Sequence, residues 1–537
     1  ILAYLTIPQF FSRSAQHFSE RPAIRNSREK PAEPRQVTYR ELERMSNNLA
    51  VGLAGMGIGR GDRVAIMSRP RIRFAAAIIA IARLGGWAVP IDPTLTRPEV
   101  AGILTEAEVK AIFAPAELFD RLPTKGPPLI DFDEGPTGTP FSSLLQEGGP
   151  PELTLSDQEI AILAYTSGTT GEAKGVMLSH GNLTADIEAC IEIMPITEED
   201  VFLTIAPWHH ILGLTTALLL PLYTGALTIY TDDYRAIAKL LAKNQVTVFT
   251  AVPKLYHTMY DKLMAQIEGS LSGRIAHKLV PRIVGKKVKN SLTGGNLRFF
   301  VSGSAPLSPR VSLGFRRLGI GLLEGYGLTE TSPVVSFCSP DSTKGGSVGA
   351  ALPSIEVRLE DVRPDGVGEL LVRGPTVMAG YYKNERATRE VIDADGWFHT
   401  GDLALIDDDG DIFLKGRAKN VIVLETGKNI YPEEIEWEIS RIPYIEEVLA
   451  RGGTCAGKEI VEVVIYPNQD RLEKEGLLED VKETIWREIK QRQRRLAPHK
   501  RIRKKDHVIL VEQPFPKTST MDIKRHLYKG GNDLPDD

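Results

Sequence analysis

The chain has 537 residues, 42% hydrophobic and 25% charged, which is the composition of a globular protein with roughly three or four domain-sized units. Lys and Arg number 65 and Asp and Glu 69, and the resulting net charge of −4 argues against a protein that coats nucleic acid. The three cysteines, Cys190, Cys338 and Cys455, lie too far apart for a disulfide framework or a zinc knuckle. We therefore expect a reducing, cytoplasmic setting.

Two segments bear on targeting. Residues 1–8 lack the positive region and cleavage site of a signal peptide, and the missing initiator Met favours a trimmed chain. Residues 211–231 carry no charge and are long enough to span a membrane. They contain Gly213, Pro221 and Gly225 and five threonines, which favours a buried helix followed by a buried strand. We therefore expect a soluble protein.

The first part of the chain alternates between strand and helix patterns. Thr38, with Glu41 three residues on, predicts a capped helix over 39–56. A strand at 63–67, a helix at 74–84 and strands at 86–91 and near 109–113 follow. This alternation predicts parallel α/β layers. Residues 115–156 are rich in Pro and Gly and predict a surface excursion before a strand at 159–165.

After Gly345 the pattern changes. Short segments with Gly and Asp turns, at 357–359, 368–373, 404–407 and 411–414, predict a small β-rich subdomain. A last unit from about residue 418 combines a helix at 432–441, a strand at 461–466, a long helix at 478–496 and a basic tail.

The most informative segment is the Gly-rich string at 165–183, which follows an apolar strand and precedes a helix. Its glycines let backbone amides approach an anion, four hydroxyls add donors and Lys174 adds a positive charge. The string predicts a phosphate-binding loop, although its spacing is not that of a Walker A loop. The alternative is an ordinary Gly/Ser/Thr turn.

These residues resemble the phosphate-binding signature of the adenylate-forming superfamily, which contains acyl-CoA synthetases, luciferases and peptide-synthetase adenylation domains. Four more segments resemble its motifs in the same order. They are the His-containing segment at 206–213, the adenine and magnesium motif at 324–331, the ribose motif at 400–402 and the hinge at 415–420. The resemblance covers nearly the whole chain.

The resemblance implies an α/β fold with a large N-terminal domain of layered α/β subdomains plus a β-rich subdomain, residues 1–417. A small, mobile α+β C-terminal domain would follow, residues 418–537. It also implies the reaction: a carboxylate attacks the α-phosphorus of ATP, and the acyl adenylate then passes its acyl group to the thiol of CoA. Residues 299–306 resemble the branch of the family that takes medium- to long-chain fatty acids.

The resemblance further implies a role for each motif residue. The phosphates of ATP would be held by Thr166, Ser167, Gly168, Thr169, Thr170, Gly171 and Lys174. The adenine pocket would be formed by Gly303, Ser304, Ala305, Glu324, Gly325, Tyr326 and Gly327. Thr329 and Glu330 would contact the α-phosphate and Mg²⁺, with Glu330 as the metal ligand, because a hard cation takes carboxylate and phosphate oxygens.

The remaining implied roles concern the ribose, the carboxylate and CoA. Asp402 would accept hydrogen bonds from the ribose, with Arg417 beside it; alternatively it is only a turn residue. His210 would form a wall of the carboxylate pocket; alternatively it is a satisfied core histidine. Gly427 would line the tunnel for the CoA pantetheine, and Lys419 would be the hinge. Glu330 itself could be a solvated surface acid.

Two basic clusters stand out. Residues 269–296 are amphipathic and contain Arg274, Lys278, Arg282, Lys286, Lys287 and Lys289, and something similar occurs in ligases for long-chain fatty acids. Residues 490–505 hold nine Lys or Arg. Either cluster could meet CoA phosphates, an acidic acyl carrier protein or an anionic membrane surface; the plainer interpretation is a solvated face.

One position departs from the family. The C-terminal motif places its catalytic Lys where this chain has Asp522, whose charge would repel both the carboxylate and the α-phosphate. Lys517 or Lys524 could substitute for it by local rearrangement. Two rivals to a fatty acid–CoA ligase therefore stay open: transfer to acyl carrier protein, and a protein impaired in adenylation that binds ATP or acyl adenylate.

Overall fold

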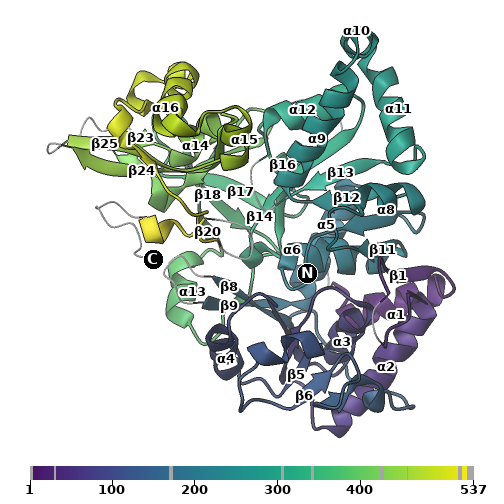
Figure 1. The fold of residues 1–537 in the computed structure, drawn as a ribbon. Helices are drawn as coiled ribbons and strands as arrows, with labels where there is room; N and C mark the ends of the chain where they lie inside the picture. The colour runs from purple at the N-terminus through teal and green to yellow at the C-terminus, as the bar shows by residue number, and fades with distance from the viewer. Residues whose placement is uncertain are drawn as a thin grey trace.

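The computed structural model describes residues 4–29, 32–167, 173–303, 307–339, 344–423, 429–455, 458–517 and 523–528. Two large sheets, a small β-rich sheet and a C-terminal unit make up the molecule (Figure 1). No helix in the described ranges is both long and apolar enough to cross a membrane.

The first large sheet has eight strands, most of them parallel as the alternating pattern predicts. Its order is β19 (Gly380–Tyr381), β9 (Ala173–Ser179), β8 (Ile160–Ser167), β4 (Trp87–Ile91), β3 (Arg63–Met67), β5 (Ala111–Ala114), β6 (Leu129–Asp131) and β7 (Thr139–Pro140). Its helices are α2 (Tyr39–Gly55), α3 (Ile72–Arg83) and α4 (Arg97–Glu106). Thr38 and Glu41 form the predicted capping box of α2.

Two features of this sheet were not expected. The surface excursion at 115–156 contributes the short edge strands β6 and β7 and two 3-10 turns, η1 (Ala116–Arg121) and η2 (Phe141–Leu144). The Gly-rich string joins β8 to β9 as an antiparallel hairpin, and only after β9 does α5 (His180–Ile193) begin. The Gly-rich segment is therefore followed by strand β9, and not directly by a helix.

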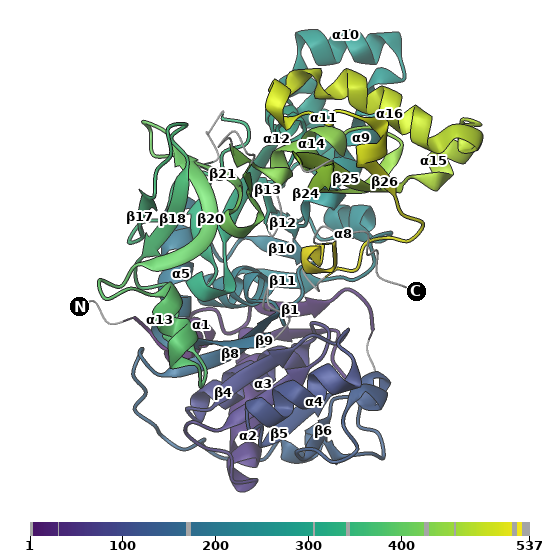
Figure 2. The same ribbon diagram turned by 90° about the vertical axis from the view of Figure 1, so that its left-hand side faces the viewer.

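The second large sheet has nine strands and lies above the first in Figure 2. Its order is β16 (Ala350–Ala351), β15 (Val334–Phe337), β14 (Gly321–Gly327), β13 (Phe299–Ser302), β12 (Val248–Ala251), β10 (Val201–Thr204), β11 (Leu227–Tyr230), β1 (Pro22–Asn26) and β2 (Gln36–Thr38). The helices of this region are α1 (Ile7–His17), α8 (Ile237–Lys243), α9 (Pro253–Glu268), α10 (Leu271–Leu279), α11 (Pro281–Thr293) and α12 (Pro309–Arg317).

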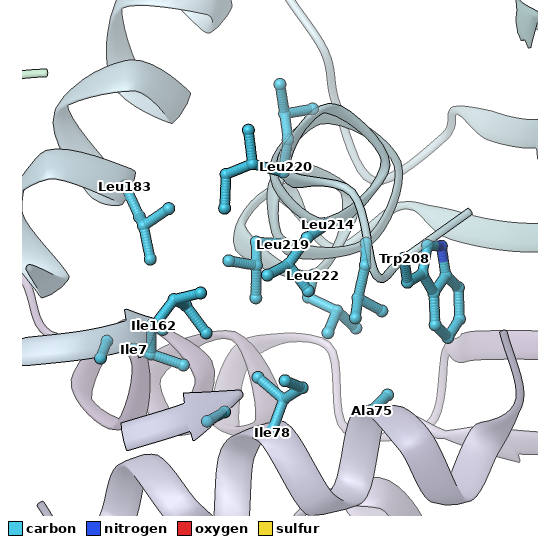
Figure 3. Packing of buried hydrophobic residues seen from close by; sticks show 14 of the residues in the cluster. Ile7, Ala75, Ile78, Ile162, Leu183, Trp208, Leu214, Leu219, Leu220 and Leu222 are labelled. Carbon is cyan, nitrogen blue, oxygen red and sulfur yellow. The ribbon is translucent and has the colours of Figure 1, made fainter. Parts of the chain in front are cut away.

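The uncharged stretch at 211–231 forms the buried helix and strand that the sequence predicts. The helical part is α6 (Ile211–Leu214), a π-helical turn at Thr215–Leu219 and α7 (Leu220–Thr224), and β11 follows. Figure 3 looks along this helix: Leu214, Leu219 and Leu222 pack toward Ala75 and Ile78 of α3. The helix thus shares one hydrophobic core with both large sheets.

The β-rich subdomain is also present. Its antiparallel sheet contains β17 (Glu356–Glu360), β18 (Gly368–Arg373), β20 (Phe398–Ile406) and β21 (Ile412–Arg417), with α13 (Glu385–Val391) nearby. Strand β20 begins earlier than predicted and includes the Thr-Gly-Asp motif. In this motif Asp402 is the register partner of Arg417 in β21.

The C-terminal unit has its own hydrophobic core. Its three-stranded sheet contains β24 (Ile445–Cys455), β25 (Lys458–Pro467) and β26 (Val508–Leu510) beside a two-stranded ladder of β22 (Ile422–Val423) and β23 (Asn429–Ile430). Its helices are α14 (Pro432–Ile439), α15 (Gln469–Lys474) and α16 (Val481–Arg492). The predicted long helix is α16 with a 3-10 turn at each end, η6 (Leu478–Asp480) and η7 (Gln493–Arg495).

Candidate active site

Tyr381 connects two motifs that are far apart in the sequence. Strand β19 pairs with β9 so that Tyr381 faces Val176, next to the Gly-rich hairpin. The Tyr381 hydroxyl donates a hydrogen bond to Glu330 Oε1 at 2.9 Å, and Lys174 Nζ lies 4.8 Å from the centre of the Tyr381 ring. Burial raises the pKa of Tyr381, and Glu330 raises it further, so the phenol stays protonated and can donate.

The sequence did not indicate Tyr381. It is followed by a second tyrosine, Tyr382, and no local pattern separates the two. The pairing of β19 with β9 makes the distinction, because adjacent residues of a strand point to opposite faces. The Tyr381 side chain thus contacts both Lys174, which is positive, and Glu330, which is negative. Both charged groups lie beside the loop predicted to bind phosphate.

Only part of the loop predicted to bind phosphate is described. Thr166 pairs with Lys174 across the hairpin, which places both where the loop begins and ends. The side chain of Ser167 and the whole of Gly168, Thr169, Thr170 and Gly171 lie outside the described residues.

Asp402 is held by two side chains from different sheets. The Tyr326 hydroxyl, from β14, donates to Asp402 Oδ2 at 2.6 Å, and Arg417 Nε lies 2.8 Å from Oδ1. Burial raises the pKa of Asp402, while Arg417 and the Tyr326 hydroxyl oppose that rise. The carboxylate therefore bonds to side chains rather than closing a turn, and it joins the nine-stranded sheet to the β-rich subdomain.

Strand β14 carries the residues predicted to form the adenine pocket. Glu324 is buried, and this burial raises its pKa to about 7 despite Ser312 and Arg316. At Gly325 an added Cβ would lie 2.8 Å from the Phe337 ring, so only glycine fits without a shift. Thr329 and Glu330 follow in a 3-10 turn, η4 (Thr329–Thr331). Ser304 and Ala305 lie outside the described residues.

An apolar cavity opens beside this strand. It measures about 740 Å³ including its opening to solvent. Its walls come from α5, the π-containing helix and strands β10, β12, β13, β14 and β15. Leu212, Thr216 and Leu220 line it from one face of the helix. Gly303, Gly325, Tyr326 and Gly327, the residues assigned to the nucleotide, line it as well.

His210 lies at the start of the helix that lines the cavity. Its ring centre is 4.3 Å from that of His209, and His209 Nε2 is 3.6 Å from Asp92 Oδ1. Burial and the neighbouring His210 lower the pKa of His209 to about 3, so that imidazole is neutral. His210 is not among the described residues that line the cavity, whereas Leu212 is.

Two places in the structure offer side chains that could bind a metal ion: the Asp92, His209 and His210 cluster, and Glu330. Asp92, His209 and His210 place ligand atoms within 4.8 Å of one another. Two imidazoles suit a transition metal better than Mg²⁺, which prefers oxygen. Glu330 is only half-buried and fits Mg²⁺ by its carboxylate, with one oxygen already fixed by Tyr381.

The predicted hinge and C-terminal residues are partly described. Lys419 lies in a short 3-10 turn, η5 (Ala418–Asn420), between β21 and β22. Lys517 forms an ion pair with Glu447, which ties it to the C-terminal sheet. Gly427 and Asp522 lie outside the described residues.

Comparison with protein families gives two matches. The profile described as AMP-binding enzyme matches residues 11–382, and that described as AMP-binding enzyme C-terminal domain matches residues 419–529. Among curated proteins, the chain is 32% identical to the long-chain-fatty-acid–CoA ligase FadD15 of Mycobacterium bovis, over 78% of this chain and 75% of that protein. It is 30% identical to the long-chain-fatty-acid–CoA ligase of Salmonella typhimurium, over 88% of each chain.

Solved structures agree in fold. ATP-bound MatB from Rhodopseudomonas palustris is 25% identical with a TM-score of 0.78, and the match covers 98% of both chains. The o-succinylbenzoate CoA synthetase MenE of Bacillus subtilis, in complex with its acyl-adenylate intermediate, is 23% identical with a TM-score of 0.78 and 99% coverage of both chains.

Proposed function

Because the chain belongs to the AMP-binding enzyme family, we propose that it is an AMP-forming fatty acid–CoA ligase. It activates a medium- to long-chain fatty acid with ATP and Mg²⁺ to an acyl adenylate and then transfers the acyl group to CoA. Curated relatives named as long-chain-fatty-acid–CoA ligases, matched over most of the chain, support this substrate class.

The apolar cavity is the observation that carries the proposal. Its walls are hydrophobic along most of their length, and at one side they are formed by the glycines and the tyrosine of the nucleotide motif. A fatty acid fits such a site with its chain among the side chains of the helix and its carboxylate toward the nucleotide. Burying the chain supplies about 0.8 kcal/mol per methylene, so a long acid binds more tightly than a short one.

The surrounding polar residues suit the adenylation step. Lys174 adds a positive charge for the β and γ phosphates, and Tyr381 fixes its position relative to Glu330. Glu330 would hold Mg²⁺, which neutralises phosphate charge when it is bound. Asp402 would bind the ribose hydroxyls by its carboxyl group, which Arg417 holds in place by an ion pair. Such a site raises the rate by holding both reactants in line and by neutralising the phosphate charge.

For the second step, residues 1–417 and 418–537 would act as two domains with the hinge at Lys419. The start of the second family match at residue 419 supports this boundary. Gly427 would line the path of the CoA pantetheine. The C-terminal domain would swing between an adenylating and a thioester-forming position.

Pyrophosphate release tests the proposal. We expect release from ATP with a fatty acid, and acyl-CoA formation when CoA is added. Acyl carrier protein in place of CoA should give no thioester. Transfer to acyl carrier protein alone would support the first rival, and nucleotide binding without pyrophosphate release would support the second.

A cavity variant tests the site itself. Thr216→Phe places a ring in the cavity and should lower kcat/KM for palmitate at least about tenfold, because a long chain no longer fits. The value for hexanoate, which needs less of the cavity, should change little. An equal loss for both acids would mean that the chain does not lie in this cavity.

A further inference from the structure

The helical hairpin of α10 and α11 exposes an apolar stripe. Leu271, Ile275 and Leu279 recur every four residues and therefore share one face of α10. They are 68%, 51% and 72% exposed, and Ile283 at the start of α11 is 59% exposed. No residue of α10 is buried. Contiguous apolar surface of this kind marks a site of interaction.

The same hairpin carries a dense positive charge. Residues 269–296 contain no Asp or Glu, although the whole chain has a net charge of −4. Five of the six Lys and Arg are exposed: Arg274, Lys278, Arg282, Lys286 and Lys287. Within the described part of the chain none of these five forms an ion pair, so their charge is available to a partner.

The basic cluster at residues 490–505 differs from the hairpin because several of its charges are paired. At residues 490–505, Lys500 pairs with Glu434, Lys505 with Glu483, and Arg492 with Glu438. Much of its charge is thus neutralised within the C-terminal unit. That cluster also has fewer exposed apolar side chains beside it, since Leu496 and Ile502 are buried in the core.

The hairpin is firmly attached. Val284, Val288 and Leu292 of α11 pack against the core formed by the nine-stranded sheet and its helices. Gly285 lies against the Leu318 backbone so closely that a Cβ would collide with it. Figures 1 and 2 both place α10 at the outer end of the molecule, beyond α9 and α12. The apolar stripe is therefore presented outward by a fixed support.

We propose that this hairpin is a docking surface for an anionic lipid membrane. An amphipathic helix with apolar residues on one face and Lys and Arg beside them lies in the interface of a bilayer. A second copy of this chain is a poor partner, because it would bring two unneutralised positive clusters together. The proposal goes beyond the proposed activity and does not depend on it.

Vesicle flotation of the full chain, without ATP or fatty acid, is the direct test. We expect the protein to float with vesicles of phosphatidylcholine plus phosphatidylserine, and much less with phosphatidylcholine alone. The triple variant Arg274→Gln, Lys278→Gln, Arg282→Gln should bind the anionic vesicles on the order of 100-fold more weakly. Its matched control is Arg494→Gln, Arg503→Gln, Lys504→Gln in the other cluster, which should bind like the parent.

A second variant tests the apolar stripe. Leu271→Ser, Ile275→Ser, Leu279→Ser should lose vesicle binding, whereas Val362→Ser with Leu478→Ser, at exposed apolar positions elsewhere, should retain it. All the substituted side chains are exposed, so folding should be unaffected, as the melting temperature will show. None of the hairpin residues lines the cavity, so pyrophosphate release with hexanoate should be unchanged.

Three outcomes would overturn the proposal. Equal vesicle binding by the hairpin variants and the parent would remove the hairpin from the interaction. Loss of binding only in the control at 494–504 would assign it to the other cluster. Self-association that the serine variant abolishes, with no flotation of the parent, would make the stripe an interface between copies. Failure of pyrophosphate release in all proteins would contradict the proposed activity alone.

Discussion

At the scale of single residues, Tyr381 contacts the two charged groups, Lys174 and Glu330, that the proposed function assigns to the phosphates and Mg²⁺. The hydroxyl fixes one oxygen of Glu330 while the ring supports Lys174. The two functions can be separated, because a phenylalanine keeps the ring and removes only the hydrogen bond.

Tyr381→Phe should lower kcat/KM for ATP roughly 10- to 100-fold, since a hydrogen bond to a charged group contributes about 1.5–3 kcal/mol. Initial rates of pyrophosphate release at varied ATP concentration measure this. Tyr382→Phe is the matched control and should behave like the parent. Indistinguishable rates for the two variants would mean that Tyr381 only packs.

Glu324 provides a pH-dependent contribution to stability. Its pKa is about 7 in the folded protein, against about 4.5 for an exposed Glu. Protonated Glu324 makes its full contribution to the free energy of unfolding below pH 4.5, and this contribution is lost as the pH rises through 7. The two pKa values differ by about 2.5, and at about 1.4 kcal/mol per unit this difference corresponds to a loss of about 3.5 kcal/mol.

Glu324→Gln should remove this dependence, because the amide does not ionise. We expect the variant to gain stability relative to the parent as the pH rises from 5 to 8, measured by urea unfolding at each pH. A constant difference between the two proteins over that range would show that Glu324 does not titrate there.

At the scale of elements, the short turn η5 is the proposed pivot. It connects β21, which holds Arg417 against Asp402, to the C-terminal unit. A turn of three residues has few backbone dihedral angles, so any swing of the C-terminal unit would concentrate its rotation there.

Lys419→Pro should separate the two half-reactions, because proline fixes φ near −65°. Adenylate formation should persist and acyl transfer to CoA should fall. Lys419→Ala controls for loss of the side chain and should affect transfer less. Single-turnover measurements of adenylate formation and of acyl transfer test this prediction. A similar loss in both steps would argue against a hinge at this residue.

At the scale of the whole molecule, the C-terminal tail reaches the N-terminal part of the chain. The pKa of Glu99, in α4, is lowered by its hydrogen bonds with Thr96 and further by Lys524. Lys524, in the described part of the tail, therefore lies close enough to α4 to act on the Glu99 carboxylate. Lys517 is bound to Glu447, so it would have to break an ion pair to replace a catalytic Lys.

Asp522→Lys should accelerate adenylation, because a positive charge where two anions meet is worth about 2.7–4 kcal/mol, or roughly 10²–10³ in rate. Attack of CoA on supplied acyl adenylate should change much less. Single-turnover acyl-adenylate formation measures the effect. Equal rates would indicate that Lys524, Lys517 or another cation already fills the role.

The sequence by itself determined the family and predicted the chemistry of its motifs. Gly, Thr and Lys in a fixed order imply phosphate binding, and helix caps and hydrophobic periods are local, so the helix at Thr38 and the strands around it could be predicted. Asp402 beside Arg417 was also foreseen, because the resemblance places both at the ribose.

Only the tertiary structure decided which distant groups meet. Tyr381 joins Lys174 to Glu330 through strand pairing, and strand pairing depends on contacts between residues far apart in the chain. The cavity exists because seven elements leave an apolar space, which no single segment encodes. The basic run of α10 was visible in the sequence, but its exposed leucines were not, because exposure depends on what the rest of the chain leaves uncovered.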